Sequence, residues 1–359
     1  MRSILVTLLG ASLTACAASA GVFHVLDAGL TTNAVSADGR YVVGYSFAPV
    51  RAMRWSFANG AEPLGTLGSN SNAFAANADG SVIGGTYNVS GTTWRPFHWS
   101  EGGGMVDLGA PGTEVRGVSA SGAAMAGSLR GPALRAFHWT QDTGIVNLGV
   151  MGDATSSEGL GMSADGSVVV GRTQGGSTFS AFRWTEGAGM TGLGFIDGTN
   201  RSEALAVNAD GSVIVGAVGR NWFEPSEQRQ AFRWTAEGGM VGLGVLDGYD
   251  RSSASAVSAD GSIVAGAAWT ADGLSLNAVV WTSDLGMTNL NDLLPTLGYS
   301  LDGWVIESIT GMSANGSVLT GTARLDDTLR SFVLTGFLPT PGTGAILALA
   351  GVAAMRRRR

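Results

Sequence analysis

The stretch Ser163-Ala-Asp-Gly-Ser-Val-Val-Val-Gly171 occurs seven times along the chain with small changes. Each copy places Ala and a turn residue before a Gly that opens an apolar run, and these glycines are Gly39, Gly80, Gly122, Gly166, Gly211, Gly261 and Gly316. Asp-Gly between two apolar runs favours a two-residue hairpin turn, in which both turn positions have positive φ. Each copy therefore predicts two antiparallel strands, A and B, joined by a tight turn.

A second phrase follows each copy, as in Ala181-Phe-Arg-Trp-Thr185 and then Gly189-Met-Thr-Gly-Leu-Gly194. It predicts two further strands, C and D. Its tryptophan recurs at Trp55, Trp99, Trp139, Trp184, Trp234 and Trp281, and the seventh copy has Ser331-Phe-Val-Leu334 instead. Four short strands in a unit of about 40 to 50 residues are typical of a propeller blade. The sequence predicts an all-β, seven-bladed β-propeller over residues 21–337, with the Phe and Trp of strand C in the core between blades.

The seventh repeat stops at Phe337, without a strand D. The segment Val22–Leu26 precedes the first strand A and occupies the place of a strand D. We therefore expect the N-terminal strand to complete the last blade. Such closure hides sheet edges that would otherwise pair with other chains.

The first 20 residues have the layout of a secretory signal peptide. Arg2 is followed by an apolar run and then by small residues ending at Ala20, where cleavage is expected. Cys16 is the only cysteine of the chain, so cleavage at Ala20 leaves the mature protein without a thiol. The alternative is that Leu13–Cys16 serves as a bacterial lipobox and Cys16 becomes a lipidated first residue.

Residues 338–359 have the three parts of a sorting tail. Two prolines come first, an apolar stretch of about a dozen residues follows, and a cluster of four arginines ends the chain; these prolines and arginines are Pro339, Pro341, Arg356, Arg357, Arg358 and Arg359. The apolar stretch is shorter than the ~20 residues of a free membrane-spanning helix, and the arginines would stay on the cytoplasmic side. We therefore expect only transient membrane insertion.

This tail resembles the PEP-CTERM sorting signal, with Thr340 in place of the usual Glu between the prolines. The resemblance implies that an exosortase-type enzyme processes the tail after signal peptidase has acted at the other end. It also implies release to the cell surface or extracellular matrix.

The Ala-Phe-x-Trp and Gly-Met-x-x-Leu-Gly phrases resemble the extracellular repeat family named HAF, after His-Ala-Phe. The resemblance covers nearly all of residues 21–337, although Arg135, Ser180 and Gln230 stand where the family has His. It implies an extracellular repeat protein without an established catalytic activity.

Composition excludes some partners. Setting aside Arg2 and the four terminal arginines, 16 of the 21 basic residues remain against 28 acidic ones, a net charge near −12. Nucleic-acid binding depends on neutralising phosphates, so we expect none. Of the three histidines, His98 and His138 stand between the Phe and Trp of strand C, where other copies have Arg. This shared position predicts a structural hydrogen-bond donor, and we expect neither a metal site nor a cofactor.

One face of the predicted ring carries the candidate binding residues. Glu114, Glu158 and Glu203 stand seven residues before the turn Asp or its equivalent. Arg201 and Arg251 lie just before the matching positions, and Arg116 lies just after Glu114. Strand A lines the channel of a propeller, so these charges should lie at the channel mouth. The variable B-to-C segments 86–96, 217–230 and 267–277 add Trp94, Trp222 and Trp269 on the same face. The alternative is that these charges only pair with one another across blades.

Two functions fit this pattern. The first is an exported, non-catalytic surface or matrix protein whose loops bind a polysaccharide or protein partner. The second is a propeller enzyme, a glycosidase or lyase acting on extracellular polysaccharide through the three glutamates. The glutamates follow the repeat itself, whereas active sites break a repeat with unique residues. The sequence therefore favours binding over catalysis.

Overall fold

The computed structural model describes residues 21–91, 93–109, 112, 114–220 and 229–337. The described residues form 28 strands and one short helix. The first half of the strands comprises β1 (Val22–Val25), β2 (Leu30–Val35), β3 (Val42–Ser46), β4 (Arg51–Ser56), β5 (Gly60–Pro63), β6 (Asn70–Ala76), β7 (Val82–Ser90), β8 (Thr93–Ser100), β9 (Gly104–Asp107), β10 (Glu114–Val118), β11 (Ala124–Arg130), β12 (Leu134–Thr140), β13 (Gly144–Asn147) and β14 (Ser156–Met162).

The second half comprises β15 (Val168–Gly175), β16 (Thr178–Thr185), β17 (Gly189–Gly192), β18 (Arg201–Val207), β19 (Val213–Gly219), β20 (Arg229–Thr235), β21 (Gly239–Gly244), β22 (Arg251–Val257), β23 (Val264–Trp269), β24 (Leu276–Thr282), β25 (Gly286–Asn289), β26 (Val305–Met312), β27 (Leu319–Leu325) and β28 (Thr328–Thr335). The helix α1 (Leu290–Thr296) follows β25.

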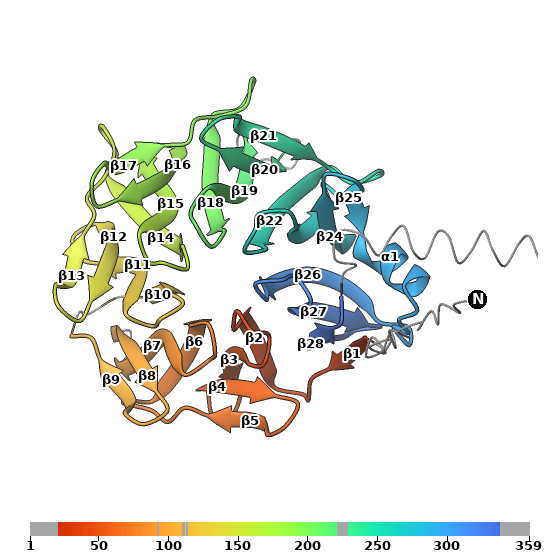
Figure 1. Cartoon of the computed structure of the whole chain (residues 1–359), viewed down its shortest axis with the longest axis horizontal. Helices are drawn as coiled ribbons and strands as arrows, with labels where there is room; N and C mark the ends of the chain where they lie inside the picture. Colours follow the sequence, from red (N-terminus) through yellow and green to blue (C-terminus); the bar gives the residue numbers. More distant parts are fainter. Residues whose placement is uncertain (1–20, 92, 110–111, 113, 221–228, 338–359) are drawn as a thin grey trace, which may run out of the picture.

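The strands form four-stranded antiparallel sheets arranged in a ring, which confirms the predicted propeller (Figure 1). Five sheets have four strands, and a sixth has eight because Arg229 of β20 pairs with Arg251 of β22 through one parallel bridge. Dividing this sheet at the bridge gives seven four-stranded units over the described residues. We number these blades 1 to 7 from β2–β5 to the unit of β26–β28 with β1.

The N-terminal strand closes the ring as predicted. β1 pairs antiparallel with β28, with Phe23 opposite Leu334 and Val25 opposite Phe332. The rings of Phe23 and Phe332 lie 5.4 Å apart. The last blade is thus built from both ends of the described chain.

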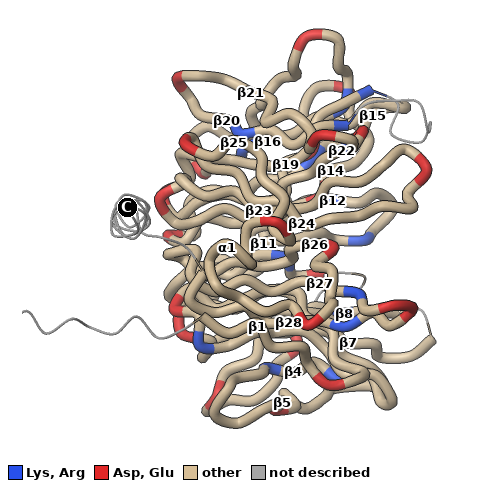
Figure 2. The backbone as a smooth tube through the Cα atoms, turned by 90° about the vertical axis from the view of Figure 1, so that its right-hand side faces the viewer, with Lys and Arg blue, Asp and Glu red and all other residues tan. Residues whose placement is uncertain are grey.

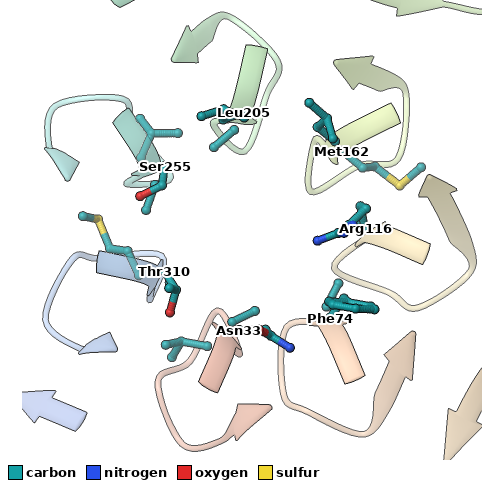
Figure 3. A pocket seen from close by; sticks show the side chains of 18 of the residues that line it. Asn33, Phe74, Arg116, Met162, Leu205, Ser255 and Thr310 are labelled. Carbon is teal, nitrogen blue, oxygen red and sulfur yellow. The ribbon is translucent and has the colours of Figure 1, made fainter. Parts of the chain in front are cut away.

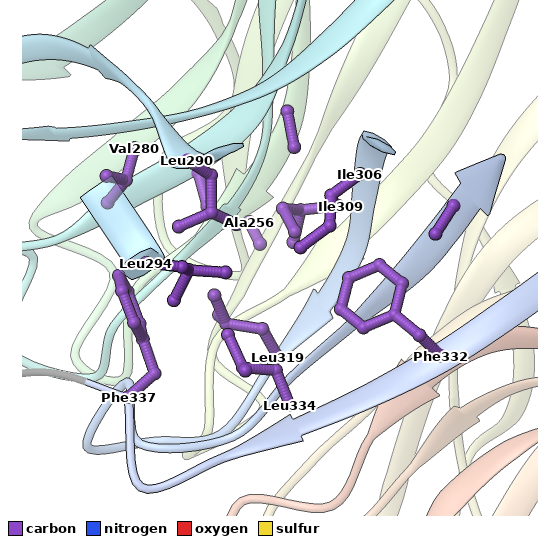
Figure 4. Close-up of a cluster of buried hydrophobic side chains, with 13 residues drawn as sticks. Ala256, Val280, Leu290, Leu294, Ile306, Ile309, Leu319, Phe332, Leu334 and Phe337 are labelled. Carbon is purple, nitrogen blue, oxygen red and sulfur yellow. The ribbon is translucent and has the colours of Figure 1, made fainter. Parts of the chain in front are cut away.

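The helix α1 was not predicted. Asn289 caps it, because its side chain accepts a hydrogen bond from the backbone N–H of Asn291. Leu290 and Leu294 are fully buried in the cluster between blades 6 and 7, together with Phe332 and Phe337 (Figure 4). The helix therefore fills the space beside the closing blade.

The turn between strands A and B differs from the predicted two-residue hairpin. Only its Gly has positive φ, +78° at Gly166, and Asp165 does not share it. The backbone N–H of Gly166 donates to the Ser163 carbonyl, and Asp165 Oδ1 accepts from Ser163 Oγ and the Ser167 N–H, at 2.5 and 2.9 Å. The acceptor capacity of the Asp side chain fixes a wider turn than Asp-Gly alone suggests.

The alanine of every turn has a clear role. Backbone hydrogen bonds of 2.7–3.2 Å join each turn to that of the next blade, for example from Ala120 N–H to Ala164 carbonyl and from Ala314 N–H back to Ala37 carbonyl. These bonds form a closed belt around the channel. The face that carries these turns is called the turn face here, and the face with the B-to-C and D-to-A connections is called the loop face.

The Phe of strand C lies in the core between blades, as predicted, whereas only some of the Trp residues do. Phe97, Phe137, Phe182, Phe232 and Phe332 are fully buried. Trp55 and Trp99 are also buried, whereas Trp139, Trp184, Trp234 and Trp281 are only half-buried. The Trp184 ring lies 5.3 Å from His138 of the preceding blade, so this position packs at the margin of the interface.

The residue between Phe and Trp is a structural donor in three blades, as predicted. Nε2 of His138 lies 3.1 Å from the Gly166 carbonyl, and Nε of Arg183 and Arg233 donate to the Gly211 and Gly261 carbonyls. Each bond reaches the turn of the next blade. Burial lowers the pKa of His98, which occupies the same register.

The predicted signal peptide and sorting tail lie outside the described residues, so both stay predictions. The sequence positions concerned are Ala20, Pro339, Pro341, Arg356, Arg357, Arg358 and Arg359. Within the part of the chain that the structure describes, no helix is long and apolar enough to cross a membrane.

Candidate functional site

A central channel of about 450 Å³ is lined by strand A of every blade. Each of these strands has a register shift five residues before the turn Asp or its equivalent. A bulge of this kind leaves one residue unpaired and redirects its side chain. Figure 3 shows the result, with side chains from all seven blades pointing into the channel. The bulge residues are Asn33, Phe74, Arg116, Leu160, Leu205, Ser255 and Thr310.

The repeated Gly at the end of the strand B phrase makes room for this bulge. A Cβ on Gly171 would overlap the Glu158 carbonyl oxygen, and a Cβ on Gly44 would overlap the Thr31 carbonyl in the same way. Strand A thus approaches strand B more closely here than any side chain allows. The repeated Gly of strand B and the bulge residue of strand A therefore depend on each other.

The two ends of the channel are chemically different. On the turn face the lining of the opening, about 220 Å³ in volume, includes the alanine of every turn: Ala37, Ala78, Ala120, Ala164, Ala209, Ala259 and Ala314. Most arginines gather instead toward the loop face, on the right of Figure 2, whereas acidic residues dominate the left-hand side. The acidic body therefore has one face on which arginines are concentrated.

The three predicted glutamates lie at this loop-face mouth, each bound to arginine. Glu114 accepts hydrogen bonds from Arg116 of the same strand, at 2.6 and 3.1 Å. Arg172 of blade 4 joins Glu158 of its own blade, at 3.0 Å, to Glu203 of blade 5, at 2.8 Å. The second oxygen of Glu203 accepts from Arg229. Glu158 and Glu203 are therefore linked across blades through Arg172, as the alternative raised by the sequence states, whereas Glu114 pairs within its own strand.

Arg201 and Arg251 belong to the same region. Arg201 is buried, and its guanidinium lies 5.6 Å from the ring of Phe179, above which Arg172 also stacks at 4.9 Å. Burial lowers the pKa of Arg229. The positive charges of Arg172 and Arg251 also lower it, whereas the negative charge of Glu203 raises it. Blades 4 to 6 thus share one packed network of arginines, carboxylates and an aromatic ring.

The predicted loop tryptophans have different outcomes. Trp94 is on β8, opposite Asn88, and Trp269 is on β23, opposite Arg251 and Leu276. Both were expected in loops. They lie on strands instead, because backbone pairing between strands B and C continues to Trp94 and Trp269. Trp269 lies beneath Arg229, with 5.6 Å between guanidinium and ring. Trp222 lies outside the described residues.

A second cavity of about 320 Å³ opens between blades 2 and 3, beside the channel mouth. Its lining includes Asn72, Phe74, Trp94, Glu114 and Arg130. It brings together one predicted carboxylate, one predicted tryptophan and one channel residue. Arg201, Arg251 and Trp269 lie away from it, in the network of blades 4 to 6.

The described residues contain no group of three or more His, Cys, Asp or Glu side chains that could hold a metal ion.

The chain is similar in fold to solved β-propellers. It matches an oligogalacturonate lyase from Vibrio parahaemolyticus with a TM-score of 0.58 and 11% identity, covering 88% of this chain and 91% of that one. An oligogalacturonate lyase in complex with manganese matches with a TM-score of 0.55 and 14% identity, covering 89% and 91%. TolB from Acinetobacter baumannii matches at a TM-score of 0.46 and 15% identity, over 69% of this chain and 61% of that one. No family model and no curated protein matches the sequence.

Most of the channel residues were not predicted from the sequence. Only Arg116 was noted, as a charge near Glu114. The available signal was a position that changes between repeats while its neighbours stay small, as in Ala73-Phe74-Ala75 and Ala254-Ser255-Ala256. Variation at one position of an otherwise regular repeat indicates a surface residue whose identity is not constrained by packing.

Proposed function

We propose that the protein is an exported, non-catalytic propeller that binds an extracellular polysaccharide on its loop face. The observation that carries this proposal is the ring of bulge residues. Seven equivalent positions hold six residue types, among them Phe74, Arg116 and Ser255, on a scaffold that otherwise repeats. Packing does not require this diversity, because these side chains face the channel.

The carboxylates support binding over catalysis. A glycosidase needs one carboxyl group to donate a proton to the sugar oxygen and a second to act as base or nucleophile. Here Glu158 and Glu203 both accept hydrogen bonds from Arg172, and Glu114 accepts from Arg116. Such charge-assisted hydrogen bonds are strong and directional, so they fix the carboxylates as structural acceptors.

The second candidate function is a polysaccharide lyase. The similarity to two oligogalacturonate lyases over most of both chains favours it. At 11–14% identity this similarity concerns the fold, on which many activities occur.

The patterns at the two ends of the sequence support the export part of this proposal. Signal peptidase would cleave after Ala20, and an exosortase-type enzyme would process the tail that begins near Pro339. The HAF-like repeats agree with this destination at the cell surface or in the matrix.

One experiment tests these points together. The protein is recovered from the surface of the producing cells, its intact mass is measured, and it is applied to a glycan array. The same sugars are then assayed for cleavage. We expect a mass without residues 1–20 and without the four terminal arginines, binding to a subset of glycans, and no turnover. Formation of unsaturated or hydrolysed products would favour the lyase or glycosidase, and a chain that binds no glycan would overturn the proposal.

A further inference from the structure

The cavity between blades 2 and 3 has two aromatic walls. Phe74, the bulge residue of β6, and Trp94, near the start of β8, are both half-buried and line the same space of about 320 Å³. This volume is at the lower end of the range for small-ligand pockets. The guanidinium of Arg116 stacks 4.3 Å from the Phe74 ring and holds it in place.

Arg130 places a positive charge at the rim of this cavity. Arg130, the last residue of β11, is exposed, and no carboxylate of the described chain lies within ion-pair distance of it. The nearby carboxylate of Glu114 is bound to Arg116 through two hydrogen bonds. The three charged groups leave one net positive charge beside the aromatic walls, in a protein body that is strongly acidic.

Polar groups complete the lining. Asn72 occupies the register of Glu114 in the preceding blade, and its buried Oδ1 has no hydrogen-bond partner among the described residues. A buried polar atom without a partner costs stability unless a ligand or water satisfies it. Thr86, opposite Asn72 on β7, adds a hydroxyl group to the same wall.

We propose that this cavity binds a uronic acid residue of the polysaccharide. The inference rests on the proposed function and adds the chemical class of the ligand. Arg130 donates hydrogen bonds to the sugar carboxylate, which is the pairing that a guanidinium favours. Phe74 and Trp94 cover the apolar faces of the ring. The amide of Asn72 and the hydroxyl of Thr86 exchange hydrogen bonds with the sugar hydroxyls.

The test compares acidic oligosaccharides with their methyl esters. The purified full chain is titrated with hexamers of galacturonate, mannuronate and guluronate, each as the free acid and as the methyl ester. We expect at least one acid to bind about tenfold more tightly than its ester, since one charge-assisted hydrogen bond lost corresponds to about that factor. Arg130→Gln should abolish this preference, Arg130→Lys should retain part of it, and Trp94→Ala should weaken both forms.

The control is Arg330→Gln, which removes the same charge from a half-buried arginine on β28 of blade 7, far from this cavity. It should change affinity less than twofold, and the thermal unfolding of all variants should show that they are folded. Equal binding of acids and esters, or a preference that survives Arg130→Gln, would overturn the uronate site. The proposed function would still stand in either case, because a glycan is bound. Absence of binding to all three acids, with other sugars bound on the glycan array, would overturn the uronate site alone. Absence of binding to every glycan on the array would overturn both.

Discussion

The turn-face end of the channel and the channel wall are built from the same seven strands and differ in almost every respect. At the turn face the residues repeat, with alanine in all seven turns and a closed belt of backbone hydrogen bonds. At the channel wall, only a few residues along the same strands, the bulge position changes from Asn33 to Phe74 to Arg116. The residues of the turns are constrained by closure of the ring, whereas the bulge residue is free to vary.

The reason for the difference is steric. At the turn face each backbone must come within hydrogen-bond distance of the next, and only a small side chain permits seven backbones to meet there. At the bulge the side chain points into open space, so its identity costs the fold little. Repeated residues therefore identify the contacts that close the ring, and non-repeated residues at one register identify the surface available for binding.

The largest effect should come from opening the ring. A chain lacking residues 21–28 loses the four residue pairs between β1 and β28 and the contact of Phe23 with Phe332. Net contributions of about 1 kcal/mol per hydrogen bond and 1.5–3 kcal/mol for burying a Phe suggest a loss above about 3 kcal/mol in unfolding free energy. Hydrogen exchange should show protection disappearing first in residues 330–334.

The reference in the same experiment is β13, the outer strand of blade 3, which is joined to its neighbour within the chain. Its protection should decrease less than that of β28. If residues 330–334 stay protected in the shortened chain, the last blade is stable without β1 and closure serves another purpose.

The sequence predicted the repeating part of this molecule well and the variable part poorly. Strands, closure and the buried Phe182 follow from periodicity, because each blade must pack on the next in the same way. The half-burial of Trp184, the extension of β8 past Trp94 and the helix α1 depend on how neighbouring blades meet. The link from Glu158 to Glu203 through Arg172 joins two blades, and no single repeat contains that information.

A smaller effect should follow from changing one turn. Ser163 is fully buried, its hydroxyl donates to Asp165, and it accepts from the backbone N–H of Val168 at 3.0 Å. Ser163→Ala leaves that N–H without a partner, at a cost of about 1–3 kcal/mol. The matched control is Ser163→Asn, because Asn77 and Asn208 make the equivalent bond in blades 2 and 5.

Urea unfolding measures both variants. We expect Ser163→Asn to stay within about 0.5 kcal/mol of the parent, in line with a substitution that the fold already accepts elsewhere. Equal losses for Ala and Asn would mean that the size of the buried side chain, and not its acceptor oxygen, is what the turn requires.

The smallest effect concerns the charge of the turn. The hydrogen bonds from the Ser163 hydroxyl and the Ser167 backbone N–H lower the pKa of Asp165 below its ordinary value of 3.8, and the equivalent bonds lower the pKa of Asp260. The pKa values of Asp79 and Asp210 are lowered by hydrogen bonds from the hydroxyl and the backbone N–H of the serine two residues later. A lowered pKa in the folded state means that the unfolded state binds more protons in acid. The stability that these groups contribute is complete above the ordinary pKa and is lost as the pH falls through the lowered value.

Blade 7 supplies the control for this pH dependence, because Asn315 holds the same turn without a charge and accepts from Ser313 Oγ and the Ser317 N–H at 3.0 Å each. Asp165→Asn should therefore fold normally, and its unfolding free energy should fall less steeply than that of the parent between pH 5 and pH 3. The difference should stay below about 1 kcal/mol, since the carboxylate is largely exposed. Asn315→Asp should steepen the same curve. Parallel curves for all three proteins would show that the turn Asp acts only as a hydrogen-bond acceptor and that its charge adds nothing to the unfolding free energy.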